Sequence, residues 1–195
     1  LPAGRGVPEQ RRPEGLDRPR QPGGNGAALR VQGRRVLRPR DGVLVGNGSN
    51  ELIFHSLLAI VPDGAAVVYP EPSFSLYRQN SVVVGGRPVG FSLESGDFSA
   101  DPRRVLRLCR EHKARAVVLC SPNNPTGNRV PDETIAAIAE SAGCAVIVDE
   151  AYCQFASGDA RSLLEAHPNL VLLRTFSKAF GLAGLRFGFS LCAPK

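Results

Sequence analysis

Beyond residue 43, short apolar runs rich in β-branched residues alternate with segments that have the spacing of amphipathic helices. Four runs are typical of buried strands, namely AAVVYP (65–70), ARAVVLC (114–120), CAVIVDE (144–150) and LVLLRTF (170–176). Helices are expected between them, at about 50–60, 101–112 and 131–142, and Asp101-Pro102 is a typical helix start. This alternation predicts an α/β fold, a mostly parallel sheet with helices on both faces.

The first 40 residues have a different composition, with ten Arg, several prolines and no sustained apolar periodicity. We expect residues 1–42 to be disordered, or to be a non-native extension produced by out-of-frame reading of GC-rich coding sequence. Residues 43–195 are expected to form the folded domain. The net charge of +6 resides in the first 40 residues, and the remainder is close to neutral, so a basic nucleic-acid-binding face is not indicated.

Two further patterns limit the location and chemistry of the chain. No apolar run reaches the length of a membrane span, and the first residues lack the features of a signal peptide. The five cysteines form no C-x-x-C pair and no His or Cys cluster has the spacing of metal ligands. We therefore expect a cytoplasmic protein with reduced thiols, no metal and no membrane association.

Polar segments follow directly on the predicted strands, where ligands of parallel α/β sheets bind. They are SPNNPTG (121–127), DEAY (149–152) and TFSKAFGLAGLR (175–186). In the last of them, a partly desolvated lysine, Lys178, could form a Schiff base with an aldehyde. The neighbouring hydroxyls of Thr175 and Ser177, together with Arg186, could hold a phosphate. Taken alone, Lys178 is more simply a surface lysine after a strand.

Asp149 ends an apolar strand, where an unpaired carboxylate is costly. A protonated pyridine nitrogen is a suitable partner for it, because an aspartate there keeps the ring an effective electron sink. Tyr152 and Asn124 could then hydrogen-bond the phenolic oxygen of such a ring. Taken alone, Asp149 could equally be a helix cap or part of a structural ion pair.

The segment GNGSNE (46–51) combines a glycine turn with a helix start. Backbone N–H groups at Gly48, Ser49 and Asn50 would point at a phosphate, assisted by the helix dipole. The segment lacks the third glycine of a dinucleotide fingerprint and the lysine of a Walker loop. Phe74, in YPEPSFSLY, could stack on a planar ring, although a lone Phe more often packs in a core.

Taken in order along the chain, these motifs resemble fold-type I pyridoxal-phosphate enzymes. LRTFSKAFGLAGLRFG and SPNNPTGN are similar to segments of the histidinol-phosphate aminotransferase family. The resemblance implies pyridoxal 5'-phosphate as cofactor, with Lys178 as its covalent anchor and proton carrier. It also implies that Asp149 pairs with the pyridine nitrogen and that Tyr152 and Asn124 contact the phenolic oxygen. Phe74 would stack on the ring, and the phosphate would be held by Gly48, Ser49, Asn50, Thr175, Ser177 and Arg186.

The resemblance further implies amino transfer between histidinol phosphate and 2-oxoglutarate or glutamate, in a homodimer. The family's N-terminal Asn-Pro-Tyr-like arm and its small C-terminal domain have no counterpart here, so we expect a fragment with little turnover alone. Three alternatives stay open. They are an aminotransferase of aromatic or other amino acids, a phosphothreonine decarboxylase-like enzyme, and a non-enzymatic pyridoxal-phosphate-binding regulatory domain.

Overall fold

The computed structural model describes residues 30–31, 34–35 and 42–193. Apart from Gly42 and two short paired strands, β1 (Arg30–Val31) and β2 (Arg34–Arg35), the segment 1–42 lies outside the described residues. The expectation of disorder or of a non-native extension there therefore stays a prediction.

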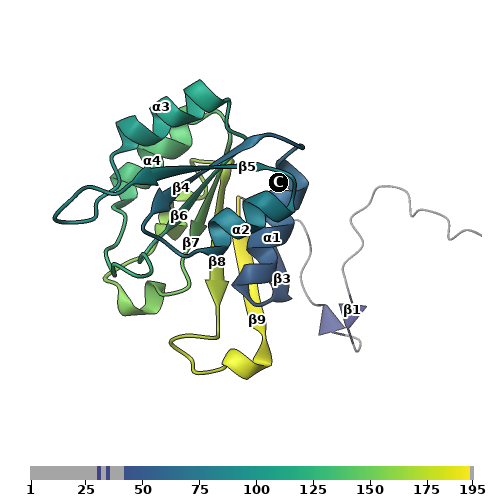
Figure 1. Ribbon diagram of the computed structural model, residues 1–195. Helices are drawn as coiled ribbons and strands as arrows, with labels where there is room; N and C mark the ends of the chain where they lie inside the picture. The colour runs from purple at the N-terminus through teal and green to yellow at the C-terminus, as the bar shows by residue number, and fades with distance from the viewer. Residues whose placement is uncertain (1–29, 32–33, 36–41, 194–195) are drawn as a thin grey trace, which may run out of the picture.

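Residues 43–192 contribute seven strands to one sheet (Figure 1). The strands are β3 (Val43–Asn47), β4 (Ala66–Glu71), β5 (Arg87–Ser92), β6 (Ala116–Cys120), β7 (Ala145–Asp149), β8 (Leu170–Thr175) and β9 (Phe187–Cys192). Their spatial order is β3-β9-β8-β7-β6-β4-β5. The five neighbouring strands β5, β4, β6, β7 and β8 are parallel, whereas β9 runs antiparallel to both β8 and β3. The sheet is thus mostly parallel, as predicted.

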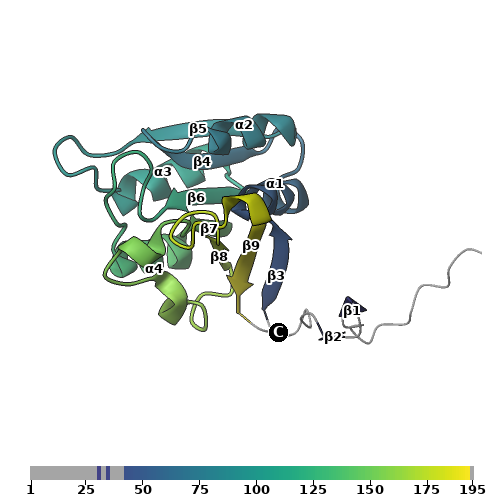
Figure 2. The same ribbon diagram turned by 90° about the horizontal axis from the view of Figure 1, so that it is seen from below.

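Helices cover both faces of this sheet, which confirms the predicted α/β layering. The helices are α1 (Ser49–Ile60), α2 (Leu76–Val83), α3 (Pro102–His112) and α4 (Asp132–Ser141), with short 3₁₀ turns η2 (Cys153–Phe155), η3 (Ala160–Leu163) and η4 (Ala183–Leu185). Figure 2 shows α1 and α2 on one side of the sheet and α3 and α4 on the other. Alternate residues of each central strand face these two layers, so that Val118 packs with α1 and Leu119 with α4.

The four predicted strands and three predicted helices are all present, with ends displaced by a few residues at most. At α3, the Asp101 side chain accepts a hydrogen bond from the Arg103 N–H at 2.9 Å, so the expected cap is confirmed. At α4, Pro131 precedes the helix and Asp132 is its first residue. The negative charge of Asp132 is stabilised there by the positive end of the helix dipole.

Within the seven-stranded sheet and its α-helices, four elements were not predicted, namely β3, β5, β9 and α2. Strands β3 and β5 are at the two edges of the sheet, where one side lacks a neighbouring strand. Their sequences contain Gly46, Pro88 and Gly90, which interrupt the apolar pattern of a strand. The apolar residues of α2 are confined to its two ends, Leu76-Tyr77 and Val82-Val83, so the short helix gives little periodic signal.

Within the part of the chain that the structure describes, no helix combines the length and apolar character needed to span a membrane. The same residues contain no cluster of three or more His, Cys, Asp or Glu side chains arranged to hold a metal ion. All five cysteines are free thiols, and Cys109, Cys120 and Cys153 are buried.

Candidate active site

A cavity of about 270 Å³ lies at the carboxyl ends of the parallel strands. Its walls come from the segments that follow β4, β6, β7 and β8, together with the start of α1. The lining residues are Ser49, Asn50, Phe74, Leu76, Tyr77, Cys120, Asn124, Asp149, Ala151, Tyr152, Thr175, Ser177, Lys178 and Arg186. The topology therefore gathers into one place every predicted site residue except Gly48, although they span 138 positions of sequence, from 49 to 186.

Asp149 forms the charged floor of the cavity. It is only 4% exposed, and its carboxylate accepts hydrogen bonds from the Tyr77 hydroxyl at 2.9 Å and the Ala151 N–H at 3.1 Å. Among the described residues, no cationic side chain is in ion-pair contact with it. Burial raises the pKa of this carboxyl to about 6, and the two hydrogen bonds partly oppose that rise. The floor thus presents a buried carboxylate that would be stabilised by a cationic ligand.

Tyr77 is a site residue that the sequence did not predict. It is fully buried on α2, and its ring packs edge-on against Phe74 with centroids 5.6 Å apart. Burial and the neighbouring Asp149 carboxylate raise the pKa of Tyr77 well above its ordinary value, so the hydroxyl stays protonated and remains a donor. Tyr77 is three residues after Phe74, and both side chains line the cavity.

Tyr77→Phe is expected to raise the pKa of Asp149 further, because the hydrogen bond that favours its ionised form is lost. A hydrogen bond to a charged group contributes about 1.5 kcal/mol or more, which corresponds to about one pH unit. The measurement is the pH midpoint of cofactor binding, which should move upward by about that amount. Tyr69→Phe is the control, because the Tyr69 hydroxyl donates to Glu71 outside the cavity. An unchanged pH midpoint in Tyr77→Phe would contradict the role of the Tyr77 hydroxyl in lowering the pKa of Asp149.

Lys178 and Tyr152 stand at the rim of the cavity. The Lys178 Nζ lies 5.4 Å from the centroid of the Tyr152 ring. Lys178 is exposed in this structure, whereas the sequence led us to expect a partly desolvated lysine. The loop that carries it, between β8 and β9, projects beyond the end of the sheet (Figure 1) and is exposed along most of its length.

Hydroxyl groups and a guanidinium gather around the start of α1. The Thr175 hydroxyl donates to Ser177 Oγ at 3.0 Å, and the Ser177 N–H donates back to Thr175 Oγ1 at 3.2 Å. The Arg186 guanidinium donates to the Asn47 carbonyl at 3.5 Å, at the end of β3 and just before α1. These donors, with the positive end of the helix dipole, form a site suited to an anion such as phosphate.

Two glycines allow the start of α1 to lie close to Arg186 and to β9. Gly48 has φ of +78°, and a Cβ there would lie 2.6 Å from the Arg186 guanidinium, so glycine permits both the turn and the contact. Gly188, on β9, leaves no room for a side chain, because a Cβ would lie 2.5 Å from the backbone of Gly48 and Ser49. Gly48 thus leaves room for Arg186 at the predicted anion site, although it does not line the cavity itself.

Gly188→Ala is expected to displace the start of α1 and to weaken phosphate binding, because the clash is with backbone that cannot move aside locally. We expect a loss of about 2–3 kcal/mol in the free energy of unfolding, measured by urea denaturation. Gly184→Ala is the matched control, since a Cβ there meets nothing within 4 Å. Equal stability of the two variants would contradict the close approach of β9 to α1.

The Cys120 thiol also lines the cavity but is poorly suited to act as a nucleophile. Burial raises its pKa to about 12, and the nearby Asp149 carboxylate acts in the same direction. Because only a thiolate attacks readily, this side chain stays inert and shapes the cavity wall.

Comparisons with known proteins agree with this arrangement. A family model described as aminotransferase class I and II matches residues 27–195. Curated histidinol-phosphate aminotransferases from Ruminiclostridium cellulolyticum and Chlorobium phaeovibrioides are 37% and 43% identical over 158 and 159 residues. Each alignment covers 80% of this chain but 44% of the relative, so the chain spans less than half the length of these relatives.

Solved structures give the same picture. The structure of histidinol-phosphate aminotransferase from Sinorhizobium meliloti in complex with pyridoxal-5'-phosphate has a TM-score of 0.73 at 32% identity, covering 79% of this chain and 43% of that chain. Aspartate aminotransferase from Thermus thermophilus with maleate has a TM-score of 0.73 at 27% identity, covering 81% of this chain and 42% of that chain.

Proposed function

Since the chain belongs to the class I and II aminotransferases, we propose that residues 43–195 form the incomplete large domain of an enzyme that uses pyridoxal 5'-phosphate. The observation that carries the proposal is that a buried Asp149 carboxylate and the amino group of Lys178 line one cavity. Asp149 has no cationic contact among the described residues. A pyridinium nitrogen would therefore supply the positive charge that stabilises this buried carboxylate.

The other lining residues suit the remaining parts of the cofactor. Pyridoxal phosphate, when bound, supplies an aldehyde that joins to amino groups and a ring that accepts electrons from the substrate carbon. Phe74 would pack on the face of that ring, while Asn124 and Tyr152 would hydrogen-bond its phenolic oxygen. The phosphate would be held by the predicted set Ser49, Asn50, Thr175, Ser177 and Arg186, with Gly48 giving Arg186 room.

Two residues of the chain would manage protons during amino transfer. The Lys178 Nζ, at the rim of the cavity, would take the proton from the substrate carbon and deliver it to the former aldehyde carbon of the cofactor. The Asp149 carboxylate would hold a proton on the ring nitrogen, which requires the carboxyl to be ionised. Cofactor binding would therefore weaken as the pH falls below about 6.

For the substrates, we propose histidinol phosphate and glutamate as amino donors, with 2-oxoglutarate as the partner keto acid. Sequence identity to curated histidinol-phosphate aminotransferases supports this choice. The fold does not select the donor, because aspartate aminotransferase matches it with the same TM-score. An aminotransferase acting on another amino acid is therefore the second candidate.

We also propose that the full-length protein is a cytoplasmic homodimer. Exposed apolar side chains on the loop that carries Lys178, at Phe180, Leu182 and Leu185, support burial against a second subunit. The five free thiols support a reducing compartment.

Transamination assays on the full-length protein that contains this chain would test the proposal. With 2-oxoglutarate as acceptor, we expect glutamate to form faster from histidinol phosphate than from phenylalanine, tyrosine or aspartate. A preference for an aromatic donor would replace the substrate assignment and keep the enzyme class. Carbon dioxide release from phosphothreonine, or cofactor binding without any turnover, would overturn amino transfer itself.

A further inference from the structure

A buried ion pair joins the ends of β7 and β8 on the face of the sheet opposite the cavity. Glu150 is 1% exposed and Arg174 is 9% exposed. Glu150 Oε2 accepts from the Arg174 Nε at 2.9 Å and from its Nη2 at 2.7 Å. Glu150 Oε1 accepts from the Ala160 N–H at 2.7 Å. Both carboxylate oxygens are therefore used, and the geometry of the pair is fixed.

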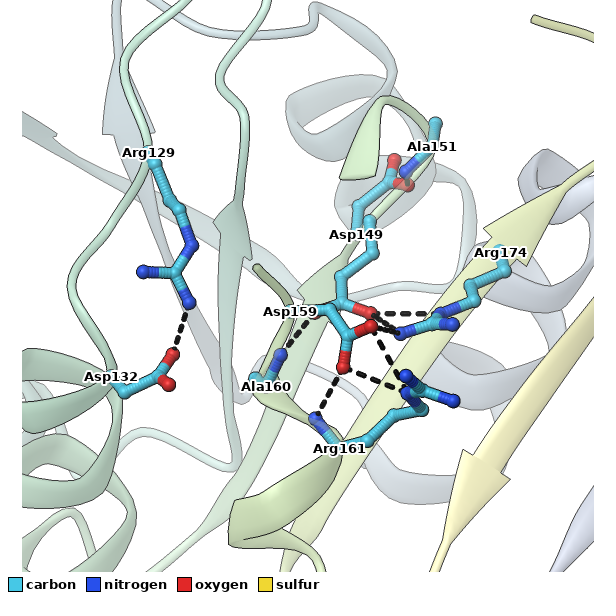
Figure 3. A network of polar contacts seen from close by, with 9 residues as sticks. Arg129, Asp132, Asp149, Ala151, Asp159, Ala160, Arg161 and Arg174 are labelled. Carbon is cyan, nitrogen blue, oxygen red and sulfur yellow. Dashed lines mark hydrogen bonds and ion pairs between the residues drawn. The ribbon is translucent and has the colours of Figure 1, made fainter. Parts of the chain in front are cut away.

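The same guanidinium also fixes the far end of the segment that follows β7. Figure 3 shows Arg174 reaching from β8 towards Asp159, and the Arg174 Nη2 lies 3.0 Å from Asp159 Oδ2. Residues 150–159 thus form a loop whose two ends, Glu150 and Asp159, both contact Arg174. The Ala160 N–H closes the loop further by donating to Glu150. This loop carries Ala151, whose N–H donates to Asp149, and Tyr152 at the rim of the cavity.

Strand geometry places the residues that flank this pair in the cavity. Successive side chains of a strand point to opposite faces, so Asp149 and Thr175 face the cavity while Glu150 and Arg174 face away from it. Arg174 is also four residues before Lys178. The ion pair consequently links the segment that carries Asp149 and Tyr152 to the segment that carries Thr175 and Lys178.

Stability alone is a poor explanation for such a pair. Removing two charges from water is costly, and well-packed apolar side chains of similar volume are often as stabilising as a buried ion pair. Two directional hydrogen bonds from the planar guanidinium to Glu150 Oε2, with Oε1 held by the Ala160 N–H, instead specify one geometry. Resting on the proposed function, we infer that Glu150 and Arg174 are positioning residues that hold Asp149 and Tyr152 in register with Lys178.

The test compares Arg174→Lys and Glu150→Gln with the wild-type chain in complex with pyridoxal 5'-phosphate. Lysine keeps the charge but loses the forked contact, and glutamine keeps the shape but loses the charge. We expect the dissociation constant for pyridoxal phosphate to rise about tenfold or more in folded protein, because small displacements of reacting groups are costly. In the full-length protein, kcat should fall while the KM for the keto acid changes little.

Arg161→Gln is the matched control, because Arg161 contacts the same Asp159 carboxylate at 2.9 Å from an exposed position. Its dissociation constant should equal that of the wild type. Asp159→Asn is a milder variant, loosening only the far end of the loop, and it keeps the test open if the other variants do not fold. We expect a change of about threefold for it, in the same direction.

The outcomes separate this inference from the proposed function. If the wild-type chain binds no pyridoxal phosphate, the proposed function fails and the positioning role fails with it. If the wild type binds and the folded variants bind equally well, with only their unfolding midpoints lowered, the ion pair is merely structural and the inference alone is overturned. A raised dissociation constant with a preserved circular dichroism spectrum supports positioning.

Discussion

Replacing Lys178 with arginine is expected to abolish the covalent lysine–cofactor bond and to lower turnover of the full-length protein by at least about a thousandfold. Arginine keeps the positive charge, but its guanidinium stays protonated and cannot attack an aldehyde or accept a proton. We expect the wild type to form a visible absorbance band with pyridoxal phosphate, and we expect this variant to lack it.

The fold should not be affected by this change. Lys178 is exposed, on a loop that projects beyond the sheet, so the free energy of unfolding should change by less than about 0.5 kcal/mol. Lys113→Arg is the matched control, because Lys113 is at the end of α3 and does not line the cavity. A visible band of wild-type intensity in Lys178→Arg would show that another amino group anchors the cofactor.

Asp149→Asn is expected to have opposite effects on cofactor binding and on the stability of the cofactor-free chain. Binding should weaken by about ten- to a hundredfold, because a hydrogen bond between charged partners contributes about 1.5–3 kcal/mol. The amide cannot ionise and so could not hold the protonated ring nitrogen that we propose as the partner of Asp149. Titration of the chain with pyridoxal phosphate at neutral pH measures this loss.

The cofactor-free chain should become more stable through the same substitution. Burial raises the pKa of Asp149 from 3.8 to about 6, so folding disfavours its ionised form. The stabilisation that this carboxyl gives in its protonated form is full below pH 3.8, and it is lost as the pH rises through about 6. At neutral pH the asparagine avoids that loss, which at 1.36 kcal/mol per pKa unit amounts to up to about 3 kcal/mol.

Asparagine fits the hydrogen bonds of this position. Its amide oxygen can accept from the Ala151 N–H, and its NH₂ can donate to the Tyr77 hydroxyl. Urea denaturation of both chains between about pH 4 and pH 8 checks the prediction, and the two stability curves should diverge as the pH rises to about 6. Curves that stay parallel throughout would contradict the raised pKa of Asp149.

The central layer of the fold could be predicted because its signals are local. Buried parallel strands such as β6 and β7 are continuously apolar, and α3 has its own cap at Asp101. The edge strands β3 and β5 depend on pairing with distant strands, and their Gly and Pro residues hide the strand pattern. The antiparallel direction of β9 follows from the loop that returns the chain beside β8.

In the candidate site too, residues with a local sequence signal were predicted and residues that depend on distant contacts were not. The sequence predicted the polar residues that directly follow β6, β7 and β8, because the carboxyl ends of parallel strands meet at one edge. Tyr77 was missed because its hydrogen bond to Asp149 joins positions 72 residues apart. The ion pair of Glu150 and Arg174 was missed for a similar reason, since each looked like an ordinary charge beside a motif residue.

The most direct test of the account is to find where the cofactor attaches. The purified wild-type chain would be incubated with pyridoxal 5'-phosphate, reduced with borohydride, digested and mapped by mass spectrometry. We predict a single labelled peptide carrying the pyridoxyl group on Lys178. A label spread over several lysines, or no label in a chain shown to be folded by circular dichroism, would contradict the assignment of this cavity as the cofactor site.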